Sequence, residues 1–274
     1  CLMEYGEGLL TAFGLGFILG PAIGAWLSQF GYGTVAFVAA GLSAVTMVLA
    51  YFMLPEPEHK GSAARRAFSL AALKQAVAHP LVGSLLAMTF TFSVSFAMFQ
   101  TSFALFAKSR LGFDTQSTGF VLAYVGVLSV IVQVGIVGRL VKKFGEKQLI
   151  AITVSALALG LVLMSLVQSV AGLLVVMPLL SLGGGASTPV LTSLITKSVD
   201  RSEVGGILGV STSVDSLSRI IAPILGNALL VFSDALPSLL GAAILMITLF
   251  FAIRLRGQSD AQLVYVPIPV KTDE

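Results

Sequence analysis

The chain has 274 residues, of which 56% are hydrophobic and only 11% are charged, and its mean hydropathy is +0.97. Soluble globular domains carry about 25% charged residues, so this composition excludes a soluble domain and predicts an integral membrane protein. The formal net charge of +3 does not predict a nucleic-acid partner, because in a membrane protein the positions of charges matter more than their sum. The single cysteine, Cys1, excludes an internal disulfide.

Eight apolar runs are each close to the ~20 residues that a membrane-spanning helix needs. They cover residues 8–29, 34–54, 81–107, 117–138, 148–168, 171–196, 204–232 and 236–253. The runs are continuous, whereas the strands of a membrane barrel alternate and need only about 9–11 residues. The sequence therefore predicts an all-α fold, a polytopic membrane bundle of about eight transmembrane helices.

The first run carries small residues at four-residue intervals: Ala12, Gly16, Gly20, Gly24 and Ser28. This spacing places them on one helix face, where the backbone of another helix can approach closely. Pro21 cannot donate the hydrogen bond that the Phe17 carbonyl would receive, so we expect the helix to kink there. The face is either an ordinary packing surface or a movable interface that takes part in gating.

The distribution of Lys and Arg predicts an orientation in the membrane. Thirteen of the sixteen lie after the second, fourth and sixth runs, or at the end of the last run and beyond it. Only Lys108 and Arg110 lie on the opposite side. Since cytoplasmic loops carry the excess of positive residues, we expect both termini to be cytoplasmic, in an inner or plasma membrane.

The longest polar gap predicts how the chain is divided. Residues 55–80 read as a cytoplasmic linker between two membrane domains. On this reading residues 1–54 are the remnant of an N-terminal domain, with two spans, and residues 81–255 form a six-helix C-terminal domain. Residues 256–274 form a cytoplasmic tail. The chain begins at Cys1, almost directly in a span, so we expect that it lacks its natural beginning.

Two charges inside one span are the sharpest functional signal. Asp215 and Arg219 lie in the run 204–232, where each charge costs at least about 2.5 kcal/mol at a helix centre. Their i, i+4 spacing lets them pair along one helix face. Either Asp215 binds a proton or a cationic substrate while Arg219 sets how readily it does so, or the two form a static pair that holds neighbouring helices together.

Aromatic and amide side chains provide weaker candidates for a substrate cavity. Phenylalanines recur at helical spacing in the third run, and a phenylalanine-lined cavity with few polar groups suits a lipophilic ligand. Phenylalanines at this spacing in a membrane helix more often face lipid or pack against other helices. The candidates are Phe92, Phe96, Phe99, Gln100, Tyr124, Gln133 and Asn227. For the amides the default role is a hydrogen bond between helices.

Other patterns carry no chemistry. The cluster Gly183–Gly185 in the sixth run predicts close helix contact or a bend, and it lacks the Gly-Lys-Ser/Thr ending of a phosphate loop. The two histidines lie in the polar gap without a cysteine or carboxylate cluster, so no metal ligand set is expected. No catalytic Ser/His/Asp set can be assembled, and we expect neither an enzyme nor a bound cofactor.

Two motifs in the chain carry a resemblance to a known family. They are Gly16-x-x-x-Gly20-Pro21-x-x-Gly24, followed by Ala25, and the stretch 138–147. Together they resemble the major facilitator superfamily, in its drug:proton antiporter branch. The first resembles the antiporter signature of that branch's fifth helix, with Ala25 in place of a second closing glycine. The stretch 138–147 resembles the family's Gly-x-Leu-Ala-Asp-Arg-x-Gly-Arg-Lys loop, with matching or basic residues at Gly138, Arg139, Lys142, Lys143, Gly145 and Lys147. Lys142 replaces the acidic residue of the pattern, so we expect the latch between this loop and a helix end to be missing.

The resemblance implies a partial major-facilitator fold, with the eight runs as helices five to twelve and the first four helices of the same transporter as missing partners. It implies a secondary transporter in the lipid bilayer, exporting lipophilic or drug-like small molecules in exchange for protons and conferring multidrug resistance. Two alternatives stay open. One is a proton-coupled uptake symporter for a metabolite, and the other is an inactive truncated or non-transporting membrane protein.

Overall fold

The computed structural model describes residues 20, 23–24, 26–53, 80–199 and 204–256, and every element within them is helical. The elements are η1 (Ser28–Phe30), α2 (Tyr32–Met53), α4 (Pro80–Leu111), α5 (Thr115–Val130), η2 (Ile131–Val137), α6 (Gly138–Phe144), α7 (Glu146–Leu166), α8 (Val170–Lys197), α9 (Val204–Leu230) and α10 (Leu236–Arg256). Within this part of the chain, seven helices are long and apolar enough to span a membrane, with α5, η2 and α6 forming one of them.

These spans confirm the second to eighth apolar runs. The observed helices differ from the predicted runs in where they begin and end. Most of the first run, 8–29, lies outside the described residues, including Gly16 and Pro21 of its motif, whereas Gly20 and Gly24 are helical, with Gly20 exposed and Gly24 partly exposed. The described parts of the proposed linker and tail are only Pro80 and Arg256. The integral membrane character and the all-helical bundle are therefore confirmed, and the division into domains stays a prediction.

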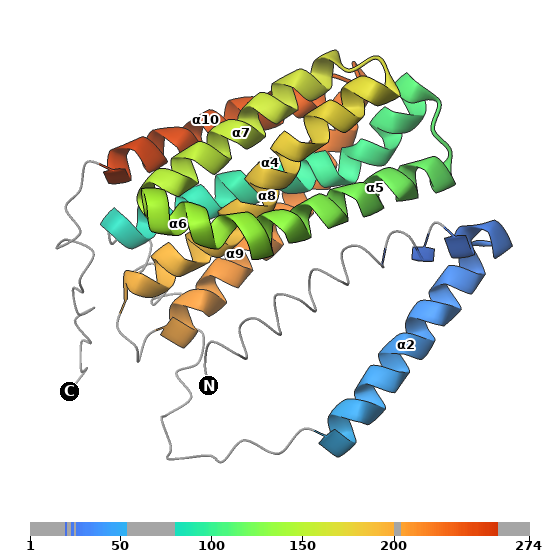
Figure 1. The fold of residues 1–274 in the computed structure, drawn as a ribbon, viewed down its shortest axis with the longest axis horizontal. Helices are drawn as coiled ribbons and strands as arrows, with labels where there is room; N and C mark the ends of the chain where they lie inside the picture. Colours follow the sequence, from blue (N-terminus) through green and yellow to red (C-terminus); the bar gives the residue numbers. More distant parts are fainter. Residues whose placement is uncertain (1–19, 21–22, 25, 54–79, 200–203, 257–274) are drawn as a thin grey trace.

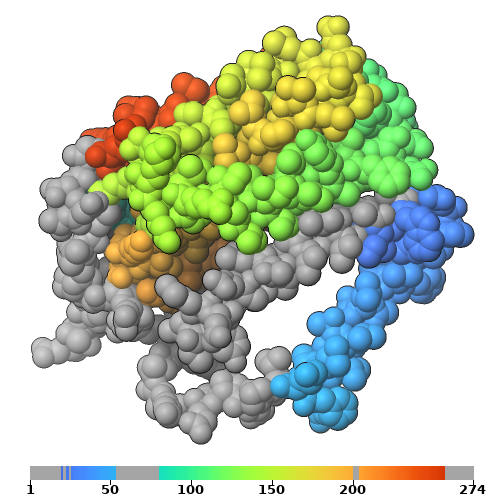
Figure 2. All heavy atoms as spheres, viewed as in Figure 1, coloured from blue at the N-terminus to red at the C-terminus, as the bar shows by residue number. Residues whose placement is uncertain are grey.

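Six of the seven spans pack into one bundle, and α2 stands apart from it (Figure 1). α4 packs against α8, α9 and α10, while α7 lies between α8 and α10. The rod formed by α5, η2 and α6 packs on α8 and gives the bundle an outer surface (Figure 2). None of the residues of α2 is buried, and Tyr32 makes a 3.2 Å hydrogen bond between its hydroxyl and Thr115 Oγ1.

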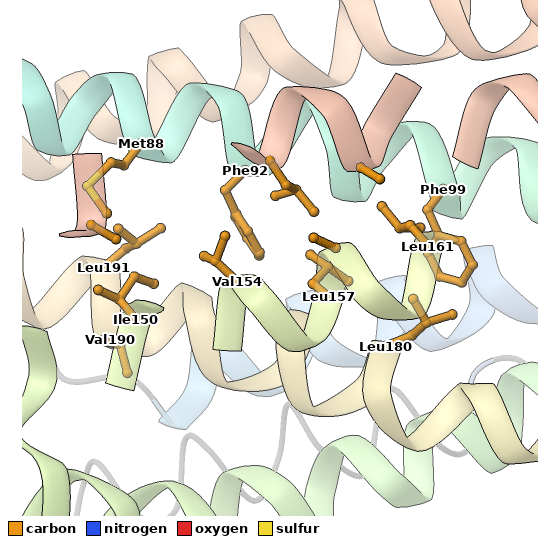
Figure 3. Close-up of a cluster of buried hydrophobic side chains, with 14 of the residues drawn as sticks. Met88, Phe92, Phe99, Ile150, Val154, Leu157, Leu161, Leu180, Val190 and Leu191 are labelled. Atoms are coloured by element: carbon orange, nitrogen blue, oxygen red, sulfur yellow. The ribbon is translucent and has the colours of Figure 1, made fainter. Parts of the chain in front are cut away.

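The core of the bundle lies where α4, α7 and α8 meet (Figure 3). It is filled by large aliphatic and aromatic side chains, among which Leu85, Ile150, Leu157, Leu161 and Leu180 are at most 1% exposed. Association of helices in lipid depends on close van der Waals packing rather than on a hydrophobic force. This dense core is what holds α4 in place and so positions the site described below.

Glycines in α8 allow the closest helix contact in the bundle. A side chain on Gly183 would run into Leu157 of α7, lying 2.8 Å from the backbone nitrogen of that residue. A side chain on Gly184 would run into the ring of Phe96 on α4. The predicted close contact at the cluster is thus confirmed, and α8 stays one continuous helix through Pro178 and Pro189.

Three of the connections that the structure describes in full are short, and they join α4 to α5, α6 to α7 and α7 to α8. Asp114 precedes α5 and accepts a 2.8 Å hydrogen bond from the backbone N–H of Ser117, as an N-cap residue does. Gly145, with φ of +73°, reverses the chain between α6 and α7. This left-handed conformation suits glycine because it has no Cβ. The turn brings the stretch 138–147 against the end of α8.

Candidate functional site

The two charges within α9 form an ion pair. Arg219 Nε lies 2.8 Å from Asp215 Oδ2, the i, i+4 geometry expected from the sequence. Asp215 is 11 residues past the start of α9, about 16 Å along the helix at 1.5 Å per residue. The pair therefore lies at membrane depth, far from either end of the span.

A third residue completes the site. Ser93 of α4 donates a 2.7 Å hydrogen bond to Asp215 Oδ1, so both carboxylate oxygens have a donor. Ser93 is buried, and sequence reasoning missed it because it is one of many hydroxyls on α4. Its involvement could be found only from the contact between α4 and α9.

The neighbouring contacts fix the side of α9 that faces α4. Ser218 Oγ donates to the carbonyls of Val214, at 2.9 Å, and of Phe90, at 3.3 Å. Ala222 is fully buried, and Gly226 allows Met98 of α4 to approach so closely that a Cβ would lie 2.8 Å from Met98 Cγ. Ser218, Ala222 and Gly226 therefore mark the side of α9 that packs on α4.

Much of the rest of α9 is uncovered within the described residues, and it presents both apolar side chains, such as Leu217, Ile220 and Ile224, and a polar strip around the ion pair. The side chain of Arg219 is 63% exposed and that of Asp215 is 35% exposed. On the same strip lie small and polar residues, which are Gly205, Gly209, Thr212 and Ser216. Ionisable side chains at membrane depth face protein or water rather than lipid, because their exposure to hydrocarbon is costly. This strip is therefore suited to an aqueous pathway or to another part of a transporter.

The phenylalanines predicted for a cavity form one row along α4. Successive rings of Phe92, Phe96, Phe99 and Phe103 lie 5.7, 6.3 and 5.7 Å apart between centroids. Phe92, Phe99 and Phe103 are buried in the core, and Figure 3 shows Phe92 and Phe99 beside α7 side chains. Only Phe96 keeps a partly exposed ring, packed over Gly184. Their arrangement supports a packing role for most of the row.

The other cavity candidates lie on four different elements. Gln100 on α4 and Tyr124 on α5 are half-buried, and Asn227 on α9 is exposed. Gln133 lies in the π-helical segment η2, and such segments are frequent at functional sites. A cavity of about 400 Å³ lies between α7 and α10, but its lining is apolar and includes none of these residues.

The stretch 138–147 is not the loop that the motif predicted, because α6 covers Gly138–Phe144, Gly145 makes the turn and Glu146 begins α7. It holds a latch that the motif comparison missed. Glu146 Oε1 accepts 2.7 Å hydrogen bonds from Lys197 Nζ and from Ser193 Oγ, both in the last turns of α8. The expectation of a missing acidic latch is therefore wrong, since Glu146 provides one from another position. The exposed Arg139, Lys142 and Lys143 lie beside it in a basic surface. No group of three His, Cys, Asp or Glu side chains in the described ranges could hold a metal ion.

The chain is similar to known transport and resistance proteins. It is 28% identical over 251 residues to the class C tetracycline resistance protein of Escherichia coli, covering 88% of this chain and 63% of that protein. It is 24% identical to multidrug resistance protein 2 of Bacillus subtilis (strain 168), covering 87% of this chain and 61% of that protein. It is 26% identical to rat (Rattus norvegicus) solute carrier family 22 member 18, covering 86% and 59%.

The chain thus spans about three-fifths of the length of these relatives. The family model of the Major Facilitator Superfamily matches residues 8–223 and, in a second overlapping match, residues 135–265. Together with the six-helix bundle and the intramembrane ion pair, these matches show that the chain belongs to the Major Facilitator Superfamily.

Proposed function

We propose that the chain is part of a secondary transporter that exports lipophilic, drug-like molecules in exchange for protons. The observation that carries the proposal is the pair of Asp215 and Arg219, held at membrane depth in α9 with one face uncovered. Ionisable residues inside membrane spans are rare because their insertion is costly, and they commonly mark ion pathways and proton relays.

Asp215 is the residue of the site that can bind a proton. Within the described residues its carboxylate takes part in two hydrogen bonds, whereas a carboxylate has about four acceptor positions. Arg219 holds the ionised form, and a proton or a cationic substrate competes with Arg219 for the carboxylate. Exchange of one cation for the other at a single carboxylate gives antiport, provided that the two cannot bind together.

Alternating access requires a second domain that rocks against the six-helix bundle. The relatives are longer than this chain, which supports a partner domain formed by further helices of the same transporter. The polar strip of α9 and the partly exposed Phe96, Gln100, Tyr124 and Gln133 are the surfaces that we assign to the path between the domains. The excess of basic residues at 138–147 supports a cytoplasmic location for that stretch and for both termini.

The substrate class follows from the relatives and from the small number of polar groups at these surfaces. Proteins named for tetracycline resistance and for multidrug resistance are similar to this chain over more than four-fifths of its length. Lipophilic ligands bind in largely apolar cavities with few polar anchors, which Gln100, Gln133 and Asn227 would supply.

The test is transport in vesicles with an imposed pH gradient, using tetracycline and tetraphenylphosphonium as probes. We expect proton influx to drive probe export, and Asp215→Asn to abolish the pH-driven component while membrane insertion stays normal. Flux of protons and probe in the same direction would favour an uptake symporter. Unchanged pH-driven transport by Asp215→Asn would refute the role of this carboxylate.

A further inference from the structure

The hydroxyl of Ser93 differs from its neighbours on α4 in where it donates. Seven Ser and Thr side chains lie on this helix between residues 84 and 102. Six of them donate to a backbone carbonyl three or four residues earlier in α4, and they are Ser84, Thr89, Thr91, Ser95, Thr101 and Ser102. Thr91 also meets a hydroxyl of another helix, since its Oγ1 lies 2.7 Å from Thr248 Oγ1 of α10. Ser93 alone among the seven donates to a charged group, Asp215 Oδ1 of α9, at 2.7 Å.

The bond from Ser93 depends on the protonation of its acceptor. An ionised carboxylate accepts a charge-assisted hydrogen bond, which is roughly twice as strong as a bond between neutral groups. Once Asp215 is protonated this advantage is lost, and the hydroxyl of Ser93 has an alternative acceptor in its own helix, the carbonyl of Thr89. The six neighbouring hydroxyls show that α4 readily provides such bonds.

No other charge in the described residues competes for this role. α9 packs against α4, α8 and α10. The charged residues of those three helices lie at their ends, and they are Lys108, Arg110, Lys197, Arg254 and Arg256. The nearest along α4, Lys108, is 15 residues from Ser93, or about 22 Å along the helix. Arg219 alone faces the carboxylate from its own helix.

From these contacts we propose that Ser93 is the positioning residue that transmits the protonation of Asp215 to α4. Ionised Asp215 holds α4 against α9 through this bond, and protonation releases it. α4 also carries the phenylalanine row, with Phe96 packed over Gly184 of α8. Release at Ser93 therefore removes the hydrogen bond from α4 to the proton site, while the contacts of Phe90 and Met98 with α9 remain. This inference rests on the proposed proton exchange at Asp215.

The test compares Ser93→Ala with Ser93→Thr, which keeps a hydroxyl, and with Ser95→Ala, which removes a buried hydroxyl that donates within α4. Export of tetraphenylphosphonium from vesicles of the transporter is measured against pH, alone and with Asp215→Asn. We expect Ser93→Ala to move the pH of half-maximal transport by about one unit or more, as loss of a hydrogen bond to a charged group implies. Ser93→Thr restores the wild-type profile, and Ser95→Ala leaves it unchanged.

The double variants separate this inference from the proposed function. Adding Ser93→Ala to Asp215→Asn should change nothing further, because the two residues act as one unit. If Asp215→Asn abolishes pH dependence while Ser93→Ala keeps the wild-type profile, the proposed function stands and the role of Ser93 fails. If Ser95→Ala shifts the profile as much as Ser93→Ala, the role of Ser93 also fails. If Asp215→Asn retains the pH dependence, both proposals fail.

Discussion

Gly183 is the position where a single methyl group tests the packing of the bundle most sharply. A Cβ at this position would lie 2.8 Å from both the backbone nitrogen and the Cα of Leu157. A clash with backbone cannot be relieved by a rotamer change, so α7 and α8 must separate or shift. Overpacking of this kind costs about 1–3 kcal/mol and sometimes more. We therefore expect Gly183→Ala to lower the free energy of unfolding by about 1–3 kcal/mol.

Gly185 provides a matched control two residues away on the same helix. A Cβ there would meet only ordinary contacts, the nearest at 3.7 Å from Ser129 and Val132. Replacing a helical glycine by alanine at such a site is favourable by about 0.5–1 kcal/mol. Reversible unfolding of the purified chain in mixed micelles with increasing denaturing detergent would measure both variants. Equal stabilities of Gly183→Ala and Gly185→Ala would refute the packing described for α7 and α8.

Three further predictions concern the ends of the helices. Glu146→Leu should destabilise the chain by about 1–3 kcal/mol, because its carboxylate is only 15% exposed and accepts two charge-assisted hydrogen bonds. Lys197→Ala should cost under about 1 kcal/mol, because the Lys197 side chain is 62% exposed. Unfolding of both variants in detergent would check this difference. Arg110→Ala should cost under about 1 kcal/mol, because its ion pair with Asp234 is 3.6 Å long and partly exposed. Asp234→Ala should cost more, since Ser109 then also loses its hydrogen-bond acceptor. A larger loss of stability in Arg110→Ala than in Asp234→Ala, measured in the same assay, would contradict this. At Asp114, hydrogen bonds from the backbone N–H and then the side chain of Ser117 hold the pKa of the carboxyl below its ordinary value of 3.8. The ionised cap therefore stabilises α5 above that value, and this stabilisation is lost as the pH falls through the lower pKa of the folded state. Stability measured from pH 5 to 2 should lack this pH-dependent component in Asp114→Asn, and an identical pH dependence in both proteins would contradict the prediction.

The membrane spans could be predicted from the sequence because their signal is local. A run of about 20 apolar residues is long enough to cross the hydrocarbon core of a bilayer, and the six spans of the bundle appear where hydropathy places them. The pairing of Asp215 with Arg219 was equally predictable, because it follows from i, i+4 spacing on one helix. The glycine cluster predicted a close helix contact at Gly183, but the sequence could not identify Leu157 as the residue that Gly183 contacts.

What could not be predicted depends on contacts between helices. Ser93 is indistinguishable in sequence from six other hydroxyls on α4, and only the crossing of α4 and α9 places it at Asp215. The latch at Glu146 escapes a position-by-position comparison with the loop motif, because it depends on where the turn at Gly145 places a carboxylate. The phenylalanine row is regular in sequence, yet only packing decides that Phe92, Phe99 and Phe103 are buried.

The central claim is that Asp215 exchanges a proton for substrate, and proton release on binding tests it most directly. Tetraphenylphosphonium would be added to the purified transporter in weakly buffered detergent solution while the pH is recorded. We predict that the wild-type protein releases protons on addition of the probe and that Asp215→Asn binds the probe without release. Proton release of the same size from Asp215→Asn would contradict the claim.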